Sequence, residues 1–203
     1  MFSPFVEENS DVPGYGDYLT DTGHNALVQH QRTVNARVFH SLRLGLNRAN
    51  RQILQQNHEL EVGKTWGVTY LPTNPISLGY PAVTVAGYSK VGDPTQLPIR
   101  RPTTTYQLSE DLSVAASRHF LKFGVEVRRN DLNGMLDLLS RGSQQFSGAL
   151  SGVGLGDLLL GLPSLGIQSK PDNIQTLRTM AYALYVQDDW RPTPRLTLNL
   201  GLR

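Results

Sequence analysis

The residues that first suggest chemistry are two adjacent carboxylates, Asp188 and Asp189, which stand directly before Trp190. Paired carboxylates support acid–base catalysis only where both reach the same substrate. The surrounding residues alternate as in a β-strand, and neighbouring residues of a strand point to opposite faces. Asp188 and Asp189 therefore cannot share a substrate or a metal ion. We interpret them as the polar end of a strand, hydrogen-bonded into the following turn.

Other site patterns are equally unsupported by the sequence. The histidines never occur at metal-ligand spacing with a carboxylate on a shared helix. The glycine pairs at 14–16 and 152–156 do not open a long helix after a buried strand, as a phosphate-binding loop would. No serine stands in a G-x-S-x-G motif. We therefore expect no catalytic residue, no metal site and no cofactor. The histidines are His24, His30, His40, His58 and His119.

The composition narrows the class of protein further. Charged residues make up 18% of the chain, below the roughly 25% usual in soluble domains, and there are 19 glycines and 12 prolines. No apolar run approaches the ~18 residues of a membrane-spanning helix. There is no cysteine, so disulfides and thiolate metal sites are excluded. The net charge of +2 comes from scattered arginines, which indicates that nucleic acid is not a partner.

The clearest structural signal is strand alternation at the C-terminal end. From position 196 onward every second residue is leucine, and the residues between are polar or glycine. The run Tyr182 to Trp190 is also strand-like, and the Arg191-Pro192-Thr193-Pro194 segment favours a tight turn between the two. This pattern predicts a hairpin with one apolar and one polar face.

Two more hairpins are predicted upstream. Residues 38–47 alternate, with 26–33 as a weaker partner strand, and 106–114 pair with 119–129 through a turn near Ser117. Glu110 interrupts the apolar face of the 106–114 strand. Connections of about 50 residues separate the hairpins; within them we expect strands at 82–88 and 144–150 and helices at 135–139 and 155–160.

Short turns on one side and long loops on the other are typical of a transmembrane β-barrel. We predict an all-β fold, a partial transmembrane antiparallel β-barrel over residues 24–203, preceded by an irregular segment at 1–23. Apolar side chains then face lipid, and we name Leu121, Phe123, Val125, Leu196, Leu198 and Leu200. Polar side chains face the lumen, and we name Arg37, Arg43, Lys122, Glu126, Arg128, Asn199 and Arg203. Trp190, Tyr182 and Tyr185 are candidates for an aromatic girdle.

The segment YVQDDWRPTPRLTLNLGLR resembles the barrel of TonB-dependent outer-membrane receptors, particularly the Oar-like group with a carboxypeptidase-regulatory-like domain. SLRLGLNR at 41–48, YPAVTVAGYSKVGD at 80–93, YQLSEDLS with HFLKFGVEVRR at 106–129 and GDLLLGLP at 156–163 agree in the same order. The resemblance covers about residues 20–203. It implies a segment of a 22-stranded, plugged barrel in the outer membrane of a Gram-negative cell.

The same resemblance implies the partners: outer-membrane lipid, a plug domain, the TonB energy-coupling complex and a solute that the sequence does not identify. The chain has no recognisable secretion signal, plug or energy-coupling box, so we expect a fragment that does not transport alone. The alternative is a soluble β-sandwich binding module, whose leucine faces would bury against a second sheet.

Overall fold

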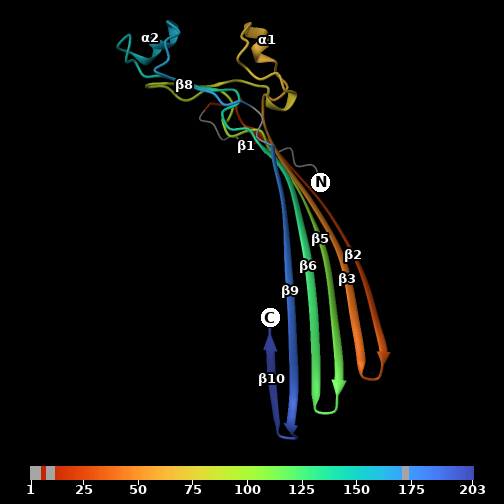
Figure 1. The fold of residues 1–203 in the computed structure, drawn as a ribbon. Helices are drawn as coiled ribbons and strands as arrows, with labels where there is room; N and C mark the ends of the chain where they lie inside the picture. The colour runs from red at the N-terminus through yellow and green to blue at the C-terminus, as the bar shows by residue number, and fades with distance from the viewer. Residues whose placement is uncertain (1–5, 8–11, 171–173) are drawn as a thin grey trace. The chain divides into compact units, whose positions relative to one another are not determined.

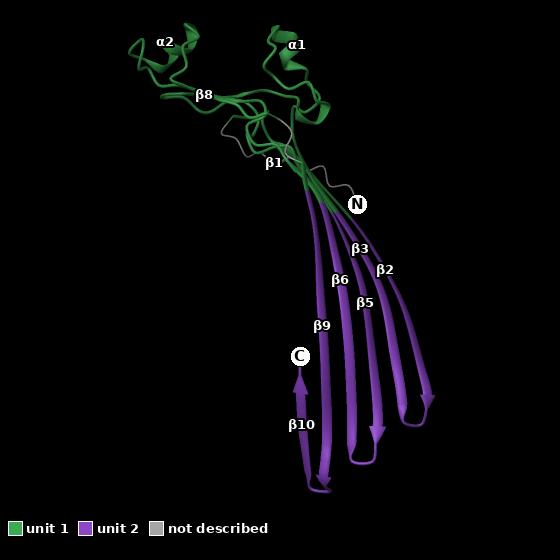
Figure 2. Cartoon of the chain, viewed as in Figure 1, with its two compact units in different colours: residues 1–22, 50–102, 133–175 green, residues 23–49, 103–132, 176–203 purple. Residues whose placement is uncertain are grey.

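A computed structural model describes residues 6–7, 12–170 and 174–203 of the chain (Figure 1). The chain forms two compact units (Figure 2). The sheet unit comprises Gly23–Ala49, Thr103–Leu132 and Thr176–Arg203, and the loop unit comprises Met1–Thr22, Asn50–Pro102 and Asn133–Gln175. The long strands begin or end in the loop unit and have most of their length in the sheet unit.

The sheet is built from three antiparallel hairpins placed side by side (Figure 1). Its strand order is β1-β2-β3-β5-β6-β9-β10, so each hairpin neighbours the next one in the sequence. The strands are β1 (Val6–Glu7), β2 (Asp17–Asn35), β3 (Val38–Gln55), β5 (Ile99–Ala116), β6 (His119–Leu136), β9 (Ile174–Thr193) and β10 (Leu196–Leu202). The predicted all-β fold of antiparallel hairpins joined by long loops on one side is confirmed.

Each hairpin closes with a two-residue turn, at 36–37, 117–118 and 194–195. The last turn lies later than the predicted segment 191–194, because β9 continues through Pro192. The register of β9 against β10 shifts between Leu196 and Leu198, which leaves an extra residue in β9 at this point. A proline is tolerated in a strand at such a bulge, because its missing N–H does not break a regular ladder.

The strands are longer than the roughly ten residues that cross a bilayer. β2, β3, β5, β6 and β9 contain 19, 18, 18, 18 and 20 residues. At about 3.3 Å per residue and a tilt near 40°, such strands rise about 45 Å, against an apolar band of about 25 Å. β2 begins at Asp17, inside the segment 1–23 that was expected to be irregular; residues 1–5 and 8–11 of that segment lie outside the described residues.

The loop unit has a small sheet of its own, formed by β4 (Ala82–Val85), β7 (Ser143–Phe146) and β8 (Leu165–Ile167). β4 and β7 pair in parallel, and β7 and β8 pair antiparallel. The unit also contains α1 (Val62–Trp66), the 3₁₀ helix η1 (Pro75–Ser77) and α2 (Gly154–Leu159). The helix predicted at 155–160 corresponds to α2, and the strand predicted at 82–88 corresponds to β4, which ends at Val85. The strand predicted at 144–150 is confirmed only to Phe146, where β7 ends. The predicted helix at 135–139 is wrong, because β6 remains paired in the sheet to Leu136.

The two long connections are joined by buried polar groups. The Arg141 guanidinium is 2% exposed and donates to the carbonyl oxygens of Pro94 (2.7 Å) and Leu97 (3.0 Å). Within the first connection, the buried Asp93 carboxylate accepts from the Tyr80 N–H at 2.7 Å. Burial lowers the pKa of Arg141 and raises the pKa of Asp93, because a charge loses its hydration inside the unit.

The apolar core lies in the loop unit alone. Every buried hydrophobic side chain of the described residues belongs to this unit: Val62, Leu71, Ala82, Val85, Leu97 and Phe146. The described part of the sheet unit has no buried hydrophobic side chain. A sheet without a hydrophobic core of its own is stable only where something other than water, such as protein or lipid, covers its apolar face.

The buried carboxylate of Asp157 organises the turn before α2. It accepts hydrogen bonds from the N–H groups of Gly148 (2.8 Å) and Ser151 (2.7 Å). The Ser151 side chain and these N–H groups hold the pKa of Asp157 below its ordinary value. The stabilisation is therefore present above the unfolded-state pKa of about 3.9 and is lost as the pH falls through the lower folded-state pKa.

We expect Asp157→Ala to leave these N–H groups without an acceptor and to open the turn locally. Amide hydrogen exchange at Gly148 and Ser151 should become roughly tenfold faster or more. Glu59→Ala, at an exposed carboxylate of the same unit, is the control and should leave this exchange unchanged. Unchanged exchange in Asp157→Ala would contradict the role assigned to this carboxylate.

Candidate functional site

One face of the sheet, here called the polar face, carries a hydrogen-bonded cluster that crosses three of its strands. The Asp111 carboxylate of β5 accepts from the Tyr185 hydroxyl of β9 at 2.8 Å and forms an ion pair with Arg43 of β3. Asp111 therefore links all three hairpins from one side. The cluster borders a groove of about 180 Å³ that is also lined by Glu126 and Arg203.

Gly124 of β6 makes this cluster possible. A Cβ at Gly124 would lie 1.8 Å from the Tyr185 ring, so only glycine leaves room for the ring to cross β6 toward Asp111. Tyr185 therefore belongs to the polar face and not to the aromatic girdle predicted for it. The alternation of β6 places Gly124 between Lys122 and Glu126 on the polar face. Its contact with the Tyr185 ring depends on the alignment of β6 with β9, which the local sequence does not determine.

The residues predicted to face the lumen are found in different settings. Arg43, Glu126 and Arg203 line the same groove. Arg128 forms an ion pair with Glu126 at 2.7 Å, and the Lys122 ammonium lies 5.3 Å from the centre of the Phe120 ring.

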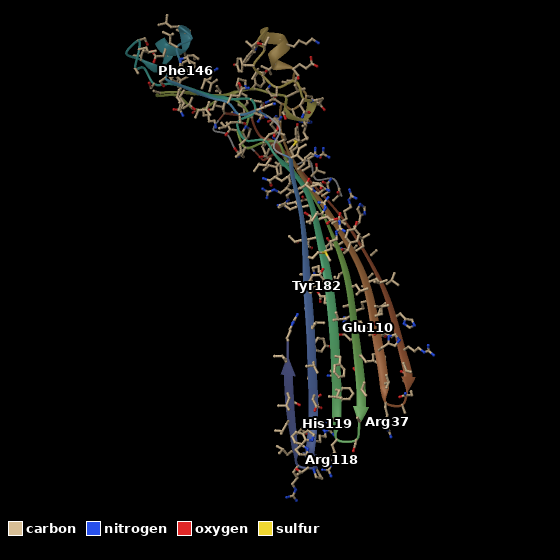
Figure 3. All side chains as sticks on the ribbon, viewed as in Figure 1. Arg37, Glu110, Arg118, His119, Phe146 and Tyr182 are labelled. Carbon is tan, nitrogen blue, oxygen red and sulfur yellow. The ribbon has the colours of Figure 1, made fainter. Side chains whose placement is uncertain are left out.

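Two further lumen candidates complete this set. Asn199 of β10 pairs with Asp189 of β9, on the face opposite Asp188. Arg37 departs from its prediction: it lies in the 36–37 turn, where its N–H donates to Asn35, because β2 and β3 are joined at this point (Figure 3).

The other face, here called the apolar face, carries the residues predicted to meet lipid. Phe123 is 40% exposed, and Leu196, Leu198 and Leu200 are 48%, 37% and 55% exposed. Leu121 and Val125 alternate with the polar-face residues of β6 and are partly exposed. These leucines are exposed, whereas the sandwich alternative would bury them against a second sheet.

Polar and aromatic groups mark both limits of the apolar band. At the turn end, His119 stacks on Trp190 with ring centres 5.7 Å apart and pairs with Asp188 at 2.7 Å. Toward the loops, Asp131 pairs with Arg129 at 2.9 Å and with Arg178 at 3.4 Å. Between His119 and Arg129 the strand rises about 33 Å, or about 25 Å along the normal of a tilted barrel, which equals the expected apolar band.

The two remaining girdle candidates lie on the apolar face. Trp190 is three residues from the end of β9, and Tyr182 stands between Trp190 and Arg178 along that strand. Figure 3 shows Tyr182 well away from the turns. Tyr182 is 71% exposed. At a membrane surface the ring of a tyrosine meets the apolar region and its hydroxyl meets water, so the hydroxyl needs no partner in the protein. Both residues therefore lie on the face that an aromatic girdle requires, and the girdle itself stays a prediction.

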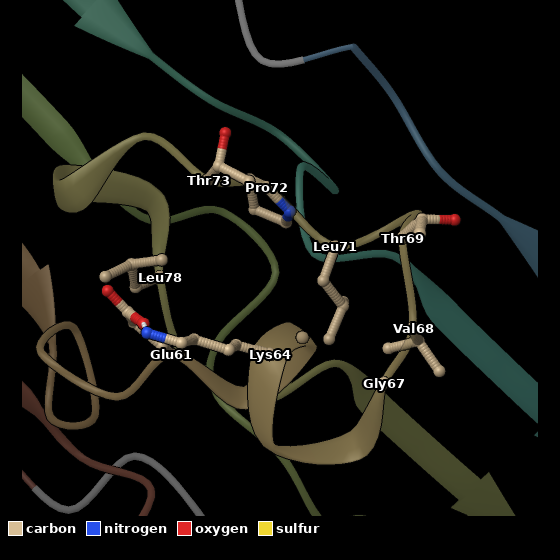
Figure 4. A pocket seen from close by; sticks show the side chains of 10 residues that line it. Glu61, Lys64, Gly67, Val68, Thr69, Leu71, Pro72, Thr73 and Leu78 are labelled. Atoms are coloured by element: carbon tan, nitrogen blue, oxygen red, sulfur yellow. Dashed lines mark ion pairs between the residues drawn. The ribbon is translucent and has the colours of Figure 1, made fainter.

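The loop unit contains a separate cavity of about 530 Å³ around α1 (Figure 4). Its lining is mainly apolar, with Val68, Leu71 and Leu78 among the side chains. The Lys64 ammonium pairs with Glu61 at 3.2 Å on its border. A volume of this size is typical of small-molecule sites. Glu61 and Lys64 are the charged residues in the lining of this cavity.

Metal chemistry has no support in the described ranges, where no group of three His, Cys, Asp or Glu side chains is arranged to hold an ion. None of the helices in these ranges is long and apolar enough to span a membrane.

The alternating faces, the band of about 25 Å and the two-residue turns define a class, the strands of an outer-membrane β-barrel. A family model agrees over nearly the whole chain: the outer membrane beta barrel domain matches residues 2–203. The chain belongs to this family. The outer-membrane location and the transmembrane barrel strands are thereby confirmed, and the sandwich alternative is set aside. No curated protein and no solved structure matches the chain.

We expect Asp111 and Tyr185 to be energetically coupled in the complete protein that contains this chain. A double-mutant cycle of Asp111→Ala and Tyr185→Phe, measured by denaturant unfolding from lipid vesicles, should give a coupling of about 1 kcal/mol. The Tyr185→Phe change keeps the ring over Gly124 and removes only the hydroxyl. Tyr182→Phe, on the opposite face of β9, is the control and should show no coupling. Additive effects of Asp111→Ala and Tyr185→Phe would contradict the cluster.

Proposed function

We propose that this chain is part of the barrel of a TonB-dependent outer-membrane receptor of the Oar-like group. The complete protein would take a bulky solute across the outer membrane, with energy from the TonB complex. The resemblance of the C-terminal segment to that group supports the proposal, and this segment forms the hairpin β9–β10 in the structure. The chain would supply wall strands and extracellular loops, not the energy-coupled part.

The observation that carries the proposal is the open sheet. In the described residues β10 pairs only with β9, and β1 covers β2 only at Tyr18 and Asp17. Open strand edges are not tolerated in a bilayer, because unpaired N–H and C=O groups find no water there. Further strands must therefore complete the wall, which makes the barrel larger than the five long strands and the short β10 seen here. Large barrels enclose an aqueous channel or a plugged lumen.

The polar face gives this lumen a charged lining. Arg43 and Asp111 lie at the groove, and Glu126 and Arg203 border the same groove. Such a wall suits contacts with a polar plug or a hydrated solute. The 530 Å³ cavity of the loop unit adds an apolar surface of a size that fits part of a bulky solute.

A passive pore would have the same wall, so the experiment must separate a plugged receptor from an open channel. We expect the complete protein, inserted in a planar lipid bilayer, to show no steady ion conductance. Urea at a concentration that unfolds the plug but leaves the barrel folded should then produce a conductance, which confirms that the barrel was inserted. The periplasmic domain of TonB should bind the same preparation. A large steady conductance without urea, or no binding of TonB, would contradict the proposal.

A further inference from the structure

Each of the three short turns of the sheet has an arginine as its second residue. The turns read Ala36-Arg37, Ser117-Arg118 and Pro194-Arg195, and all three arginines are exposed. We call Arg37, Arg118 and Arg195 the turn arginines. A basic residue at the same place in every hairpin indicates a common role at this end of the sheet.

Backbone hydrogen bonds hold the three turns side by side. The Ala115 N–H of β5 donates to the carbonyl oxygen of Arg37 at 2.7 Å, and the Arg191 N–H of β9 donates to the carbonyl oxygen of Arg118 at 2.7 Å. Figure 3 shows Arg37 and Arg118 at this end of neighbouring hairpins. The turn arginines therefore form one row along the edge where the short turns lie.

The stagger of the turns brings this row to one level of the membrane. The second turn begins two residues beyond Ala115, and the third begins three residues beyond Arg191. Each step is therefore about 7–10 Å along the strands, over the roughly 10 Å that separate two turns across the sheet. This ratio corresponds to a tilt of about 35–45°, which is the tilt of strands in a transmembrane barrel. In strands tilted in this way, the three turns lie level.

That level is the boundary between hydrocarbon and head groups. Each turn arginine directly precedes the first residue of a strand, and His119, which follows Arg118, marks the turn-end limit of the apolar band. Head groups occupy roughly 5–7 Å on each side of a bilayer, and an exposed arginine side chain extends into this layer. Short turns of such barrels lie on the periplasmic side. The turn arginines therefore face the head groups of the periplasmic leaflet.

Basic side chains outnumber acidic ones at this end of the sheet. Asp189 is the only acidic residue within five positions of the three turns, and its Oδ1 accepts from the Gln187 side chain at 3.0 Å. The basic residues within the same distance are Arg32, Arg37, Arg118, Lys122, Arg191 and Arg195.

The turn arginines also keep free hydrogen-bond donors. Among the described residues, no acceptor or ion pair is found for the guanidinium groups of Arg37 and Arg195. The Arg118 guanidinium donates to the Pro192 carbonyl oxygen at 3.0 Å through one of its nitrogens. A guanidinium has five N–H donors, so each of the three can still bind a phosphate.

An anionic head group fits this row better than a protein does. Lipid surrounds the whole wall, so it meets the arginine of every hairpin, whereas one protein partner would contact one part of the edge. Turns of two residues also do not extend far beyond the head groups. We propose that the turn arginines bind the phosphates of anionic phospholipids in the periplasmic leaflet. This proposal rests on the outer-membrane barrel strands and is independent of solute transport.

The test uses the complete protein and native mass spectrometry from detergent micelles that contain equal amounts of phosphatidylglycerol and phosphatidylcholine with identical acyl chains. At low ionic strength the wild-type protein should retain phosphatidylglycerol about tenfold over phosphatidylcholine, whose ammonium cancels the phosphate charge. Arg37→Gln, Arg118→Gln and Arg195→Gln should each lower this preference about twofold, and the triple variant should abolish it. The triple lysine variant should keep most of it, because the charge is retained.

Arg101→Gln is the matched control, because Arg101 is an exposed arginine near the opposite end of β5. It should leave the preference unchanged, and a heat-dependent shift in gel mobility should show that each variant keeps a folded barrel. Equal retention of the two lipids by the wild-type protein, or a preference that survives in the triple glutamine variant, would overturn the proposal. If that variant kept the preference but no longer bound the periplasmic domain of TonB, the row would belong to a protein partner instead.

Discussion

The structure depends on one constraint: the sheet unit has two unlike faces and no core of its own. All buried apolar side chains of the described residues are in the loop unit, while Phe123 and the leucines of β10 remain exposed. In water this exposure would cost about 25 cal/mol for each Å² of apolar surface. In a bilayer the same surface meets hydrocarbon, and the backbone N–H and C=O groups are paired between strands. The lipid therefore takes the place that a second sheet has in a sandwich.

The hairpins are joined across their seams by polar contacts on both faces. On the apolar face a histidine pairs with a carboxylate at each seam, His40 with Glu110 and His119 with Asp188. On the polar face the Asp111 carboxylate contacts both neighbouring hairpins. These contacts lie between residues that are about 70 positions apart in the sequence, where no short turn fixes the register. They specify how one hairpin aligns with the next, because a slip by one residue would reverse every face.

The sequence predicted what depends on local alternation. β6 and β10 were recognised because each second side chain is apolar, and α2 was recognised from a short apolar run that ends near Pro163. The sequence did not predict contacts between segments that are far apart in the chain. The parallel pairing of β4 with β7 and the position of the Tyr185 ring over Gly124 both depend on tertiary alignment. Glu110 interrupts the apolar alternation of β5, and the sequence alone gives no reason for it. The structure shows that it pairs with His40 of the neighbouring strand β3. The sequence therefore predicted which face of a strand most side chains occupy, but not which side chains of other strands they contact.

The most direct measurement of the central claim compares arginine substitutions on the two faces of the sheet. Phe123→Arg and Leu198→Arg place a charge on the apolar face, and Asn199→Arg places one on the polar face of β10, next to Leu198. In the complete protein, unfolded by denaturant from lipid vesicles, the first two should lower the free energy of unfolding by about 2–4 kcal/mol near the midplane. Asn199→Arg should be tolerated. Equal tolerance on both faces would contradict a sheet that lies between lipid and a polar lumen.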